Sequence, residues 1–344
     1  MPYAQSTRWR RYRSLFFVVL AFAFVLVVGQ TTLVSRSQGY DELQQRSSAD
    51  LNRYLLSLQQ KLDRYKDLPG LLSSHSTLID ALVTPQDEFL KGQASVYLEH
   101  VNNSINAADV YLMNTDGMAI AASNWAEARS FVGKNYAFRP YFKEAVEGRP
   151  GRYFALGTVS KRRGYYFSYP VYNRSEIIGV VVVKIDLNEI ESDWTDPDLD
   201  ILVTDEDGVI FISTREDWKF RTLKPLSRQD VQRIGESLRY GDHKLTALDI
   251  LQKRERENGG AIVTLVDVKK IDNKALDGIT TREFLLQSRD LDESGLTVVV
   301  LASTKSVKGR MFYTALTVGF IFIALVLLVL VVLTRQRITR ERAR

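Results

Sequence analysis

One stretch, Asp109-Val-Tyr-Leu-Met-Asn-Thr-Asp-Gly-Met-Ala-Ile-Ala-Ala122, places a short apolar segment on each side of a turn at Asn114–Gly117. Asp-Gly suits a tight hairpin, so we predict two antiparallel strands here. The pattern returns 91 residues later, where Leu199–Val203 and Val209–Ile212 flank the turn Asp205–Gly208. This offset is close to the length of a small α/β unit and therefore predicts two copies of one fold in tandem.

The sequence after each hairpin predicts the rest of each copy. We expect a helix near Pro140–Gly148 in the first copy and a charged, mostly helical region at about Asp230–Asn258 in the second. Apolar runs predict the remaining strands, at Gly151–Gly157, Gly164–Tyr172 and Ile177–Asp186 in the first copy and at Ala261–Lys269, Phe284–Arg289 and Leu296–Ala302 in the second. The predicted fold class is therefore α+β, with antiparallel sheets.

Ahead of the first copy, apolar residues at three- and four-residue steps predict an amphipathic stalk helix over Ser37–Asp67, ended by Pro69-Gly70. The recurring residues are Leu51, Tyr54, Leu55, Leu58, Leu62 and Tyr65. At about 45 Å, such a helix is long enough to form a dimer seam or a spine, and packing on its own domain is an equally compatible role. A second helical pattern covers Asp87–Asn106.

Two apolar runs, Leu15–Val34 and Met311–Thr334, flank the rest of the chain and are long enough to cross a membrane. Their outer sides alone carry arginine clusters, at Arg8, Arg10, Arg11 and Arg13 and at Arg335, Arg337, Arg340, Arg342 and Arg344. The positive-inside rule therefore predicts cytoplasmic ends and an extracytoplasmic middle. A cleaved signal peptide is the alternative for the first run, but no convincing small-residue cleavage site follows, so we expect an uncleaved anchor.

These patterns divide the chain into seven predicted segments. They are a cytoplasmic basic tail at 1–14, a first transmembrane helix at 15–34, stalk and packing helices at 35–106, a membrane-distal unit at 107–195, a membrane-proximal unit at 196–310, a second transmembrane helix at 311–334 and a cytoplasmic basic segment at 335–344.

The distribution of charge argues against a nucleic-acid partner. The formal net charge is +5, yet the two tails together carry +8, which leaves −3 for the part between them. The basic residues thus report membrane orientation, and anionic lipid is their natural partner. We expect no nucleic-acid binding.

Residue usage excludes disulfides, thiol nucleophiles and cysteine-ligated metals. The chain has no cysteine, and its three histidines, His75, His100 and His243, lie far apart, so we expect no metal site. A membrane-anchored enzyme such as a hydrolase is the alternative, but the chain lacks a G-x-S-x-G motif and a paired His-Glu motif. We therefore predict no catalytic residue.

The residues best suited to bind a ligand lie in the first copy. Arg139 directly precedes Pro140, a typical first residue of a helix, so its guanidinium can lie beside free helix amides and bind a carboxylate. Lys184 ends a buried-looking strand, where an ammonium group is costly without an anionic partner. Two cations between aromatic walls can hold a small molecule with a carboxylate at each end.

A purely structural interpretation of these residues stays open at this point. Arg139 can be a surface residue or a partner of Glu144 or Glu147, and Lys184 can pair with a neighbour of Asp186. Aromatic residues such as Tyr141 and Phe142 more often belong to a core than to a ligand wall.

Four motifs together resemble the sensors of one family. They are N-Y-x-F-R-P-Y-F-x-x-A from Asn135, Y-F-A-L-G-T from Tyr153, R-G-Y-Y-x-S-Y-P-V from Arg163 and G-V-V-V-V-K-I-D-L from Gly179. This block resembles the periplasmic sensor of C4-dicarboxylate sensor histidine kinases of the DctB type. The resemblance implies a tandem PAS-like (double Cache) fold whose membrane-distal unit binds succinate, fumarate or malate.

The same resemblance implies which residues bind the ligand, where the protein lies and what it works with. The matching positions are Tyr136, Arg139, Gly157, Thr158, Tyr166, Ser168 and Lys184, with Tyr166 and Ser168 as the less specific matches. It implies a two-pass protein of the bacterial inner membrane with a periplasmic sensor, acting as a homodimer. It also implies control of a cytoplasmic histidine kinase and its response regulator, in a system that regulates dicarboxylate uptake.

The chain departs from the family pattern at its C-terminal end. Family members continue into a helix with the phosphoacceptor histidine and then an ATP-binding domain, whereas this sequence ends at Arg344 and has no histidine after His243. We expect a fragment or a truncated relative that needs no cofactor of its own, with ATP serving only the missing kinase region. The alternative output is a chemoreceptor or a cyclic-nucleotide signalling protein that senses another carboxylate.

Overall fold

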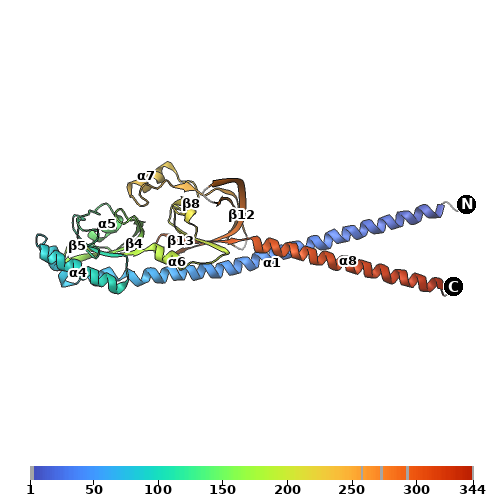
Figure 1. Ribbon diagram of the computed structural model, residues 1–344, viewed down its shortest axis with the longest axis horizontal. Coiled ribbons are helices and arrows are strands. Elements are labelled where there is room, and N and C mark those ends of the chain that lie inside the picture. The colour runs from blue at the N-terminus through green and yellow to red at the C-terminus, as the bar shows by residue number, and fades with distance from the viewer. Residues whose placement is uncertain (1–3, 257–258, 272–273, 292–293, 343–344) are drawn as a thin grey trace.

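A single helix, α1 (Ala4–Lys66), runs through both the predicted first membrane span and the predicted stalk in the computed structural model (Figure 1). The structure describes residues 4–256, 259–271, 274–291 and 294–342, with side chains described for 15–256, 259–266, 281–291 and 294–342. The side chains of the predicted basic tail at 1–14 lie outside this set. So do residues 257 and 258 of the predicted helical region, and residues 343 and 344 of the predicted C-terminal basic segment.

The apolar stripe of the stalk packs on the chain's own sheets. Leu51, Leu58 and Leu62 are buried in one continuous core that also contains residues of both sheets. Of the two roles that the sequence left open, the stripe therefore serves as a packing face. Helix α1 ends at Lys66, one residue before the predicted end at Asp67, and Pro69 lies in the first turn of a further short helix, α2 (Leu68–Leu72), where proline is well tolerated.

Two more helices complete the N-terminal half. Helix α3 (Ser76–Val83) is followed by α4 (Glu88–Ile105), close to the predicted Asp87–Asn106. Asp87 caps α4, because its side chain accepts hydrogen bonds from the amides of Phe89 and Leu90, and Asn106 ends the helix in a left-handed conformation with φ 56°. The α3 and α4 helices cover one face of the first sheet.

The first sheet has five antiparallel strands in the order β2-β1-β5-β4-β3. Their bounds are β1 (Asp109–Asn114), β2 (Ala119–Ala122), β3 (Gly151–Leu156), β4 (Arg163–Asn173) and β5 (Glu176–Asp186). Residues alternate between the two faces. Val181 and Val183 belong to the core under the helices, whereas Val180 and Val182 belong to an aromatic cluster under α5 (Pro140–Val146). We call this sheet with α5 the distal unit.

The second sheet, with its flanking segments, forms the proximal unit, which lies nearer the chain ends (Figure 1). Its strand order is β10-β11-β12-β13-β6-β7, again antiparallel. The bounds are β6 (Leu199–Thr204), β7 (Ile210–Ser213), β10 (Ile250–Glu255), β11 (Ala261–Ile271), β12 (Lys274–Leu291) and β13 (Leu296–Ser303). A short 3-10 helix η1 (Glu216–Trp218), strands β8 (Arg221–Thr222) and β9 (Thr246–Ala247), and helix α7 (Arg228–Glu236) complete it.

The prediction of a mostly helical region at Asp230–Asn258 was wrong. Up to residue 256, where the described part of this range ends, only α7 is an α-helix, and the segment continues as β9 and β10. Strand β10 is an edge strand whose side chains are largely exposed, and its charged residues Lys253, Arg254 and Glu255 removed the apolar alternation that identifies a strand.

The two units are connected through helix α6 (Leu187–Ser192). Glu191 at its end accepts hydrogen bonds from Arg163 of β4 at 2.7 and 3.0 Å and from the Ser213 amide of β7 at 2.6 Å, and it pairs with Lys219 at 2.7 Å. This buried polar cluster fixes the start of the proximal unit against the distal unit.

Helix α8 (Lys305–Arg342) packs beside α1, and both ends of the chain lie at the same end of the molecule (Figure 1). Both helices contain a segment long and apolar enough to cross a membrane. The predicted α+β fold class, with a long N-terminal helix, two antiparallel sheets and two apolar terminal helices, is confirmed.

Candidate functional site

Arg139 is buried at the start of α5, although it is an arginine. It forms the N-cap of this helix with extended backbone angles, φ −75° and ψ 135°, and Pro140 follows as the first helical residue. Its side chain packs over the ring of Phe138, and the whole residue is only 2% exposed. The position beside the helix start is the one expected from the Arg-Pro sequence.

The guanidinium of Arg139 has neutral partners. It donates hydrogen bonds to the carbonyl oxygen of Leu156 at 3.0 Å and to that of Leu238 at 3.4 Å. Neither of the alternative partners considered for it is used, because Glu144 accepts from the Arg152 amide and Glu147 pairs with Arg149. Within the part of the chain that the structure describes, no carboxylate pairs with this cation. A buried charge without a counter-charge is costly, which favours an anionic ligand.

A small cavity lies beside Arg139. Its volume is about 10 Å³, space for one water molecule at most. Five of the seven predicted site residues line it, namely Tyr136, Arg139, Gly157, Thr158 and Tyr166. The remaining lining residues are Tyr111, Phe131, Tyr141 and Val159. The structure thus brings together residues from the α5 start, the β3 end and the middle of the sheet.

Tyrosine hydroxyl groups supply much of the polarity of the cavity walls. The hydroxyls of Tyr111 and Tyr141 share a hydrogen bond of 2.7 Å, whereas the buried hydroxyl of Tyr136 has no partner among the described residues. Burial raises the pKa of Tyr141 to about 12 and raises the pKa values of Tyr111, Tyr136 and Tyr166 as well. All four groups are therefore neutral hydrogen-bond donors at physiological pH.

Lys184 lies next to this cavity but does not line it. Its ammonium forms an ion pair with Asp109 at 2.7 Å, donates a second hydrogen bond to the Ser160 hydroxyl at 3.0 Å, and lies 5.2 Å from the ring centre of Phe131. These two hydrogen bonds use two of its three N–H donors. Burial raises the pKa of Asp109, and the attraction of Lys184 lowers it in part. The expected anionic partner of Lys184 is thus present in the protein itself.

Ser168, the last of the predicted site residues, does not line the cavity but holds α5 in place beside it. Its hydroxyl donates a 2.7 Å hydrogen bond to the carbonyl oxygen of Tyr141 and fixes the first turn of α5 against β4. Gly151 makes this contact possible, since a Cβ there would lie 2.4 Å from both the Ser168 hydroxyl and the Tyr141 carbonyl oxygen. Gly157 is needed for a similar reason, because its Cβ would lie 2.3 Å from the Ser160 hydroxyl.

Sequence reasoning missed four cavity residues, Tyr111, Phe131, Tyr141 and Val159, and both partners of Lys184. Tyr111 had a usable signal, because its place in the first hairpin strand puts it on one face with Val182, its neighbour in β5. Phe131 and Val159 lie in irregular segments with no periodic pattern. Asp109 and Ser160 reach Lys184 only through the strand register and the loop after β3.

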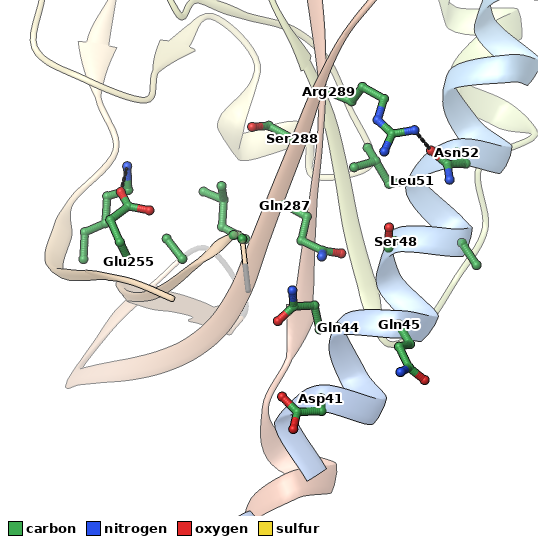
Figure 2. A pocket seen from close by; sticks show the side chains of 16 residues that line it. Asp41, Gln44, Gln45, Ser48, Leu51, Asn52, Glu255, Gln287, Ser288 and Arg289 are labelled. Carbon is green, nitrogen blue, oxygen red and sulfur yellow. Dashed lines mark hydrogen bonds and ion pairs between the residues drawn. The ribbon is translucent and has the colours of Figure 1, made fainter. Parts of the chain in front are cut away.

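A larger hollow than this cavity lies elsewhere, between α1 and strands β10 to β12, with a volume of about 880 Å³ (Figure 2). Its walls carry amides, hydroxyls and opposed charges, such as Asp41 and Glu255 against Lys253 and Arg289. Arg289 already donates to Asn52 across it, and none of the described lining residues has a buried polar atom without a partner. This groove is less suited to a charged ligand than the site at Arg139. Among the described residues, no group of three or more histidine, aspartate or glutamate side chains could hold a metal ion.

The chain resembles known sensors over most of its length. Residues 33–311 match the family described as Cache domain. The V. cholerae histidine kinase DctB sensor domain, a solved structure, is 35% identical with a TM-score of 0.69, and the match covers 77% of this chain and 98% of that one. The chain belongs to the DctB group of Cache-domain sensors. The resemblance found in the four sequence motifs is thereby confirmed.

Two curated relatives of this Cache-domain sensor are named C4-dicarboxylate transport sensor protein DctB. The protein from Pseudomonas aeruginosa is 34% identical, and the match covers 96% of this chain and 48% of that protein. The protein from Rhizobium meliloti is 35% identical, and the match covers 76% of this chain and 42% of that protein. The chain thus spans about half the length of these relatives. The sensory domain of the Campylobacter jejuni chemoreceptor Tlp3, at 16% identity and a TM-score of 0.51, shares the fold alone.

Proposed function

We propose that this Cache-domain sensor binds a C4 dicarboxylate, such as succinate, fumarate or malate, in the distal unit. One observation carries the proposal. The buried guanidinium of Arg139 has only carbonyl partners among the described residues, and the unpaired hydroxyl of Tyr136 lines the same cavity. A carboxylate satisfies both groups at once, since it supplies the missing negative charge and accepts the hydroxyl hydrogen. The names of the two curated relatives support the same ligand class.

The first carboxylate of the ligand would lie between Arg139, Tyr136 and the Gly157–Thr158 segment. The hydroxyls of Thr158 and Tyr166 are further donors at the cavity wall. The second carboxylate would accept a hydrogen bond from the third N–H donor of Lys184, whose other two donors hold Asp109 and Ser160. Ser168 would act indirectly, by holding the first turn of α5.

Binding requires the distal unit to open. A cavity of about 10 Å³ cannot hold a four-carbon diacid, so the ligand must select or produce an arrangement in which α5 and the β3 end lie farther apart. The free energy for this change comes from the charge pairing that the ligand adds. A difference between the empty and occupied arrangements is the minimum that a sensor needs.

The surroundings of the sensor follow from its two apolar helices. We propose that α1 and α8 cross the bacterial inner membrane and that both sheets lie in the periplasm, because arginines gather at the outer ends of these helices. Anionic lipid would contact these arginines. As the family resemblance implies, we further propose that a homodimer controls a cytoplasmic histidine kinase, which uses ATP, and through it a response regulator of dicarboxylate uptake. The name of the solved V. cholerae structure, a histidine kinase sensor domain, supports this proposal.

The test is calorimetric titration of the full chain in lipid nanodiscs. Succinate, fumarate and malate are compared with butyrate, which has one carboxylate, and with succinamide, which has none. We expect binding of the diacids, weaker binding of butyrate and no binding of succinamide. Arg139→Gln should abolish diacid binding, whereas Arg149→Gln, which changes an exposed arginine just beyond α5, should not. Equal binding of succinamide and succinate, or no binding of any diacid, contradicts the proposal.

A further inference from the structure

A turn of the proximal unit, at residues 238–241, contacts the distal unit beside Arg139. Strand β3 is an edge of the distal sheet, and at its end the Leu156 amide donates a 2.8 Å hydrogen bond to the carbonyl oxygen of Arg239. The neighbouring carbonyl oxygen, that of Leu238, accepts from the guanidinium of Arg139. The guanidinium also donates to the carbonyl oxygen of Leu156. The central cation of the candidate site is thus held by both units at once.

The side chain of Arg239 connects this turn to both units. Its Nε donates to the Tyr153 hydroxyl of β3 at 3.1 Å, and its Nη1 donates to Asp205 of the β6–β7 turn at 3.2 Å. The guanidinium lies 4.9 Å from the ring centres of Tyr153 and Phe154, close enough for cation–π attraction. Arg239 therefore joins the edge of the distal sheet to a carboxylate of the proximal sheet.

Asp205 is a rigid anchor for this contact. Its side chain is fully buried, and it accepts hydrogen bonds from the amides of Asp207 and Val209 and from the Tyr240 hydroxyl. An anchor with this many partners has one orientation. Because Asp205 is fixed, a displacement of β3 relative to the proximal sheet must change the contact between the Arg239 guanidinium and Asp205.

The backbone of the turn has an unusual conformation that the contact maintains. Leu238 has φ 49°, a left-handed value that is costly for a residue with a branched side chain, and Gly241 follows with φ 59°. A Cβ at Gly241 would lie 3.3 Å from a methyl carbon of Leu156. Such a strained turn is kept only when its surroundings determine it, and here they include the end of β3.

We propose that Arg239 is a positioning residue for the dicarboxylate site, acting from the proximal unit through the β3 end and Arg139. The inference rests on the proposed function and adds which residue links the site to the second unit. Arg239 holds the turn whose Leu238 carbonyl orients the Arg139 guanidinium before a ligand arrives. If the contact between this turn and β3 changes the affinity for the ligand, then ligand binding must change the stability of that contact by the same free energy.

The variants separate this role from simple packing. Arg239→Ala removes the hydrogen bonds to Tyr153 and Asp205 and the cation–π contacts, whereas Arg239→Lys keeps a cation over the rings and opposite Asp205. Arg215→Ala is the matched control in the same unit, because Arg215 also lies over an aromatic ring, that of Trp218 at 4.8 Å, and pairs with an aspartate, Asp217 at 3.0 Å. This control has the same chemistry away from the distal unit.

The measurement is succinate binding to the full chain in nanodiscs, with thermal unfolding of each variant. We expect Arg239→Ala to weaken binding by about tenfold, the loss typical of a hydrogen bond to a charged group. Arg239→Lys should recover part of this loss, and Arg215→Ala should bind as the native chain does. Native-like or tighter binding by Arg239→Ala overturns the inference. If Arg239→Ala does not fold, Arg239→Lys decides, and unchanged affinity in that variant overturns the inference.

Hydrogen–deuterium exchange provides a readout that a structural role alone would not move. Succinate should alter the exchange of residues 236–242 in the native chain, although these residues lie outside the cavity, and the effect should disappear in Arg239→Ala. Unaltered exchange in a native chain that binds succinate overturns the inference. Absence of succinate binding by the native chain instead points to failure of the proposed function.

Discussion

The ammonium of Lys184 and the carboxylate of Asp109 form a buried ion pair between directly opposite residues of β5 and β1, 2.7 Å apart. The two side chains are 2% and 14% exposed. The charge of Lys184 is therefore balanced inside the protein, whereas that of Arg139 is not. This difference assigns unequal tasks to the two cations of the site, with Arg139 as the main attraction for an anion.

The ion pair predicts non-additive effects on stability. Lys184→Met leaves a buried carboxylate without its partner and should lower the free energy of unfolding by about 3–5 kcal/mol. The double variant Lys184→Met/Asp109→Asn should lose less than the sum of the two single variants, because no unpaired charge is left. Chemical unfolding of all four proteins, followed by circular dichroism, measures the coupling. Additive losses would show that the pair contributes nothing of its own.

The unpaired hydroxyl of Tyr136 predicts opposite effects on stability and on binding. Tyr136→Phe removes a buried polar group that lacks a partner and should raise the free energy of unfolding by about 1 kcal/mol, while it weakens succinate binding by about tenfold. Thermal unfolding and calorimetry measure the two quantities. Tyr111→Phe is the control, because it leaves the Tyr141 hydroxyl unpaired and should destabilise the protein. Unchanged succinate affinity in Tyr136→Phe would remove this hydroxyl from the site.

Two glycines in very different surroundings predict changes of opposite sign. Gly92 lies within α4 and has open space where an alanine would place its Cβ, so Gly92→Ala should stabilise the protein by about 0.5–1 kcal/mol. At Gly179 a Cβ would lie 2.4 Å from the Met113 carbonyl oxygen and 2.6 Å from a Leu82 methyl, so Gly179→Ala should destabilise it by about 1–3 kcal/mol. Thermal unfolding compares them, and equal shifts would contradict the packing described for β5.

The Glu191 cluster predicts a loss of stability in acid. Burial alone raises the pKa of Glu191, but hydrogen bonds from Arg163, Lys219 and the Ser213 amide outweigh it and hold the pKa below its ordinary value of 4.5. The folded state therefore binds this proton less readily than the unfolded state, and the stabilisation is complete above pH 4.5 and lost as pH falls through the lowered pKa.

This prediction is measured as a difference between two proteins. The free energy of unfolding of the native chain should exceed that of Glu191→Gln at neutral pH, and the gap should narrow as the pH is lowered below about 4.5. Glu147→Gln, at an exposed position, should follow the native curve. A gap that stays constant with pH would mean that Glu191 does not contribute through its charge.

The sequence predicted those parts of the structure that follow from local patterns. The hairpin strands followed from apolar segments around Asp-Gly turns, and the N-cap position of Arg139 followed from the proline after it. The exposed edge strand β10 was misassigned because its side chains face solvent and lack the alternation of a buried strand.

The parts that the sequence could not predict depend on distant segments. Asp109 meets Lys184 only because β1 and β5 pair in one particular register across 75 residues. The carbonyl of Leu238 reaches Arg139 across 99 residues and from the other unit. Neither contact leaves a periodic signal, because each joins single residues at the ends of elements.

The uninterrupted course of α1 has a mechanical consequence. Its 63 residues make a rod of about 95 Å at 1.5 Å per residue, so a tilt of about 2° at one end displaces the other by about 3 Å. The rod has no joint between the sheets that it supports and the arginine-rich start of the chain. A small rotation of the distal sheet is thus geometrically magnified into a shift comparable to half a helical turn at the arginine-rich end of this helix.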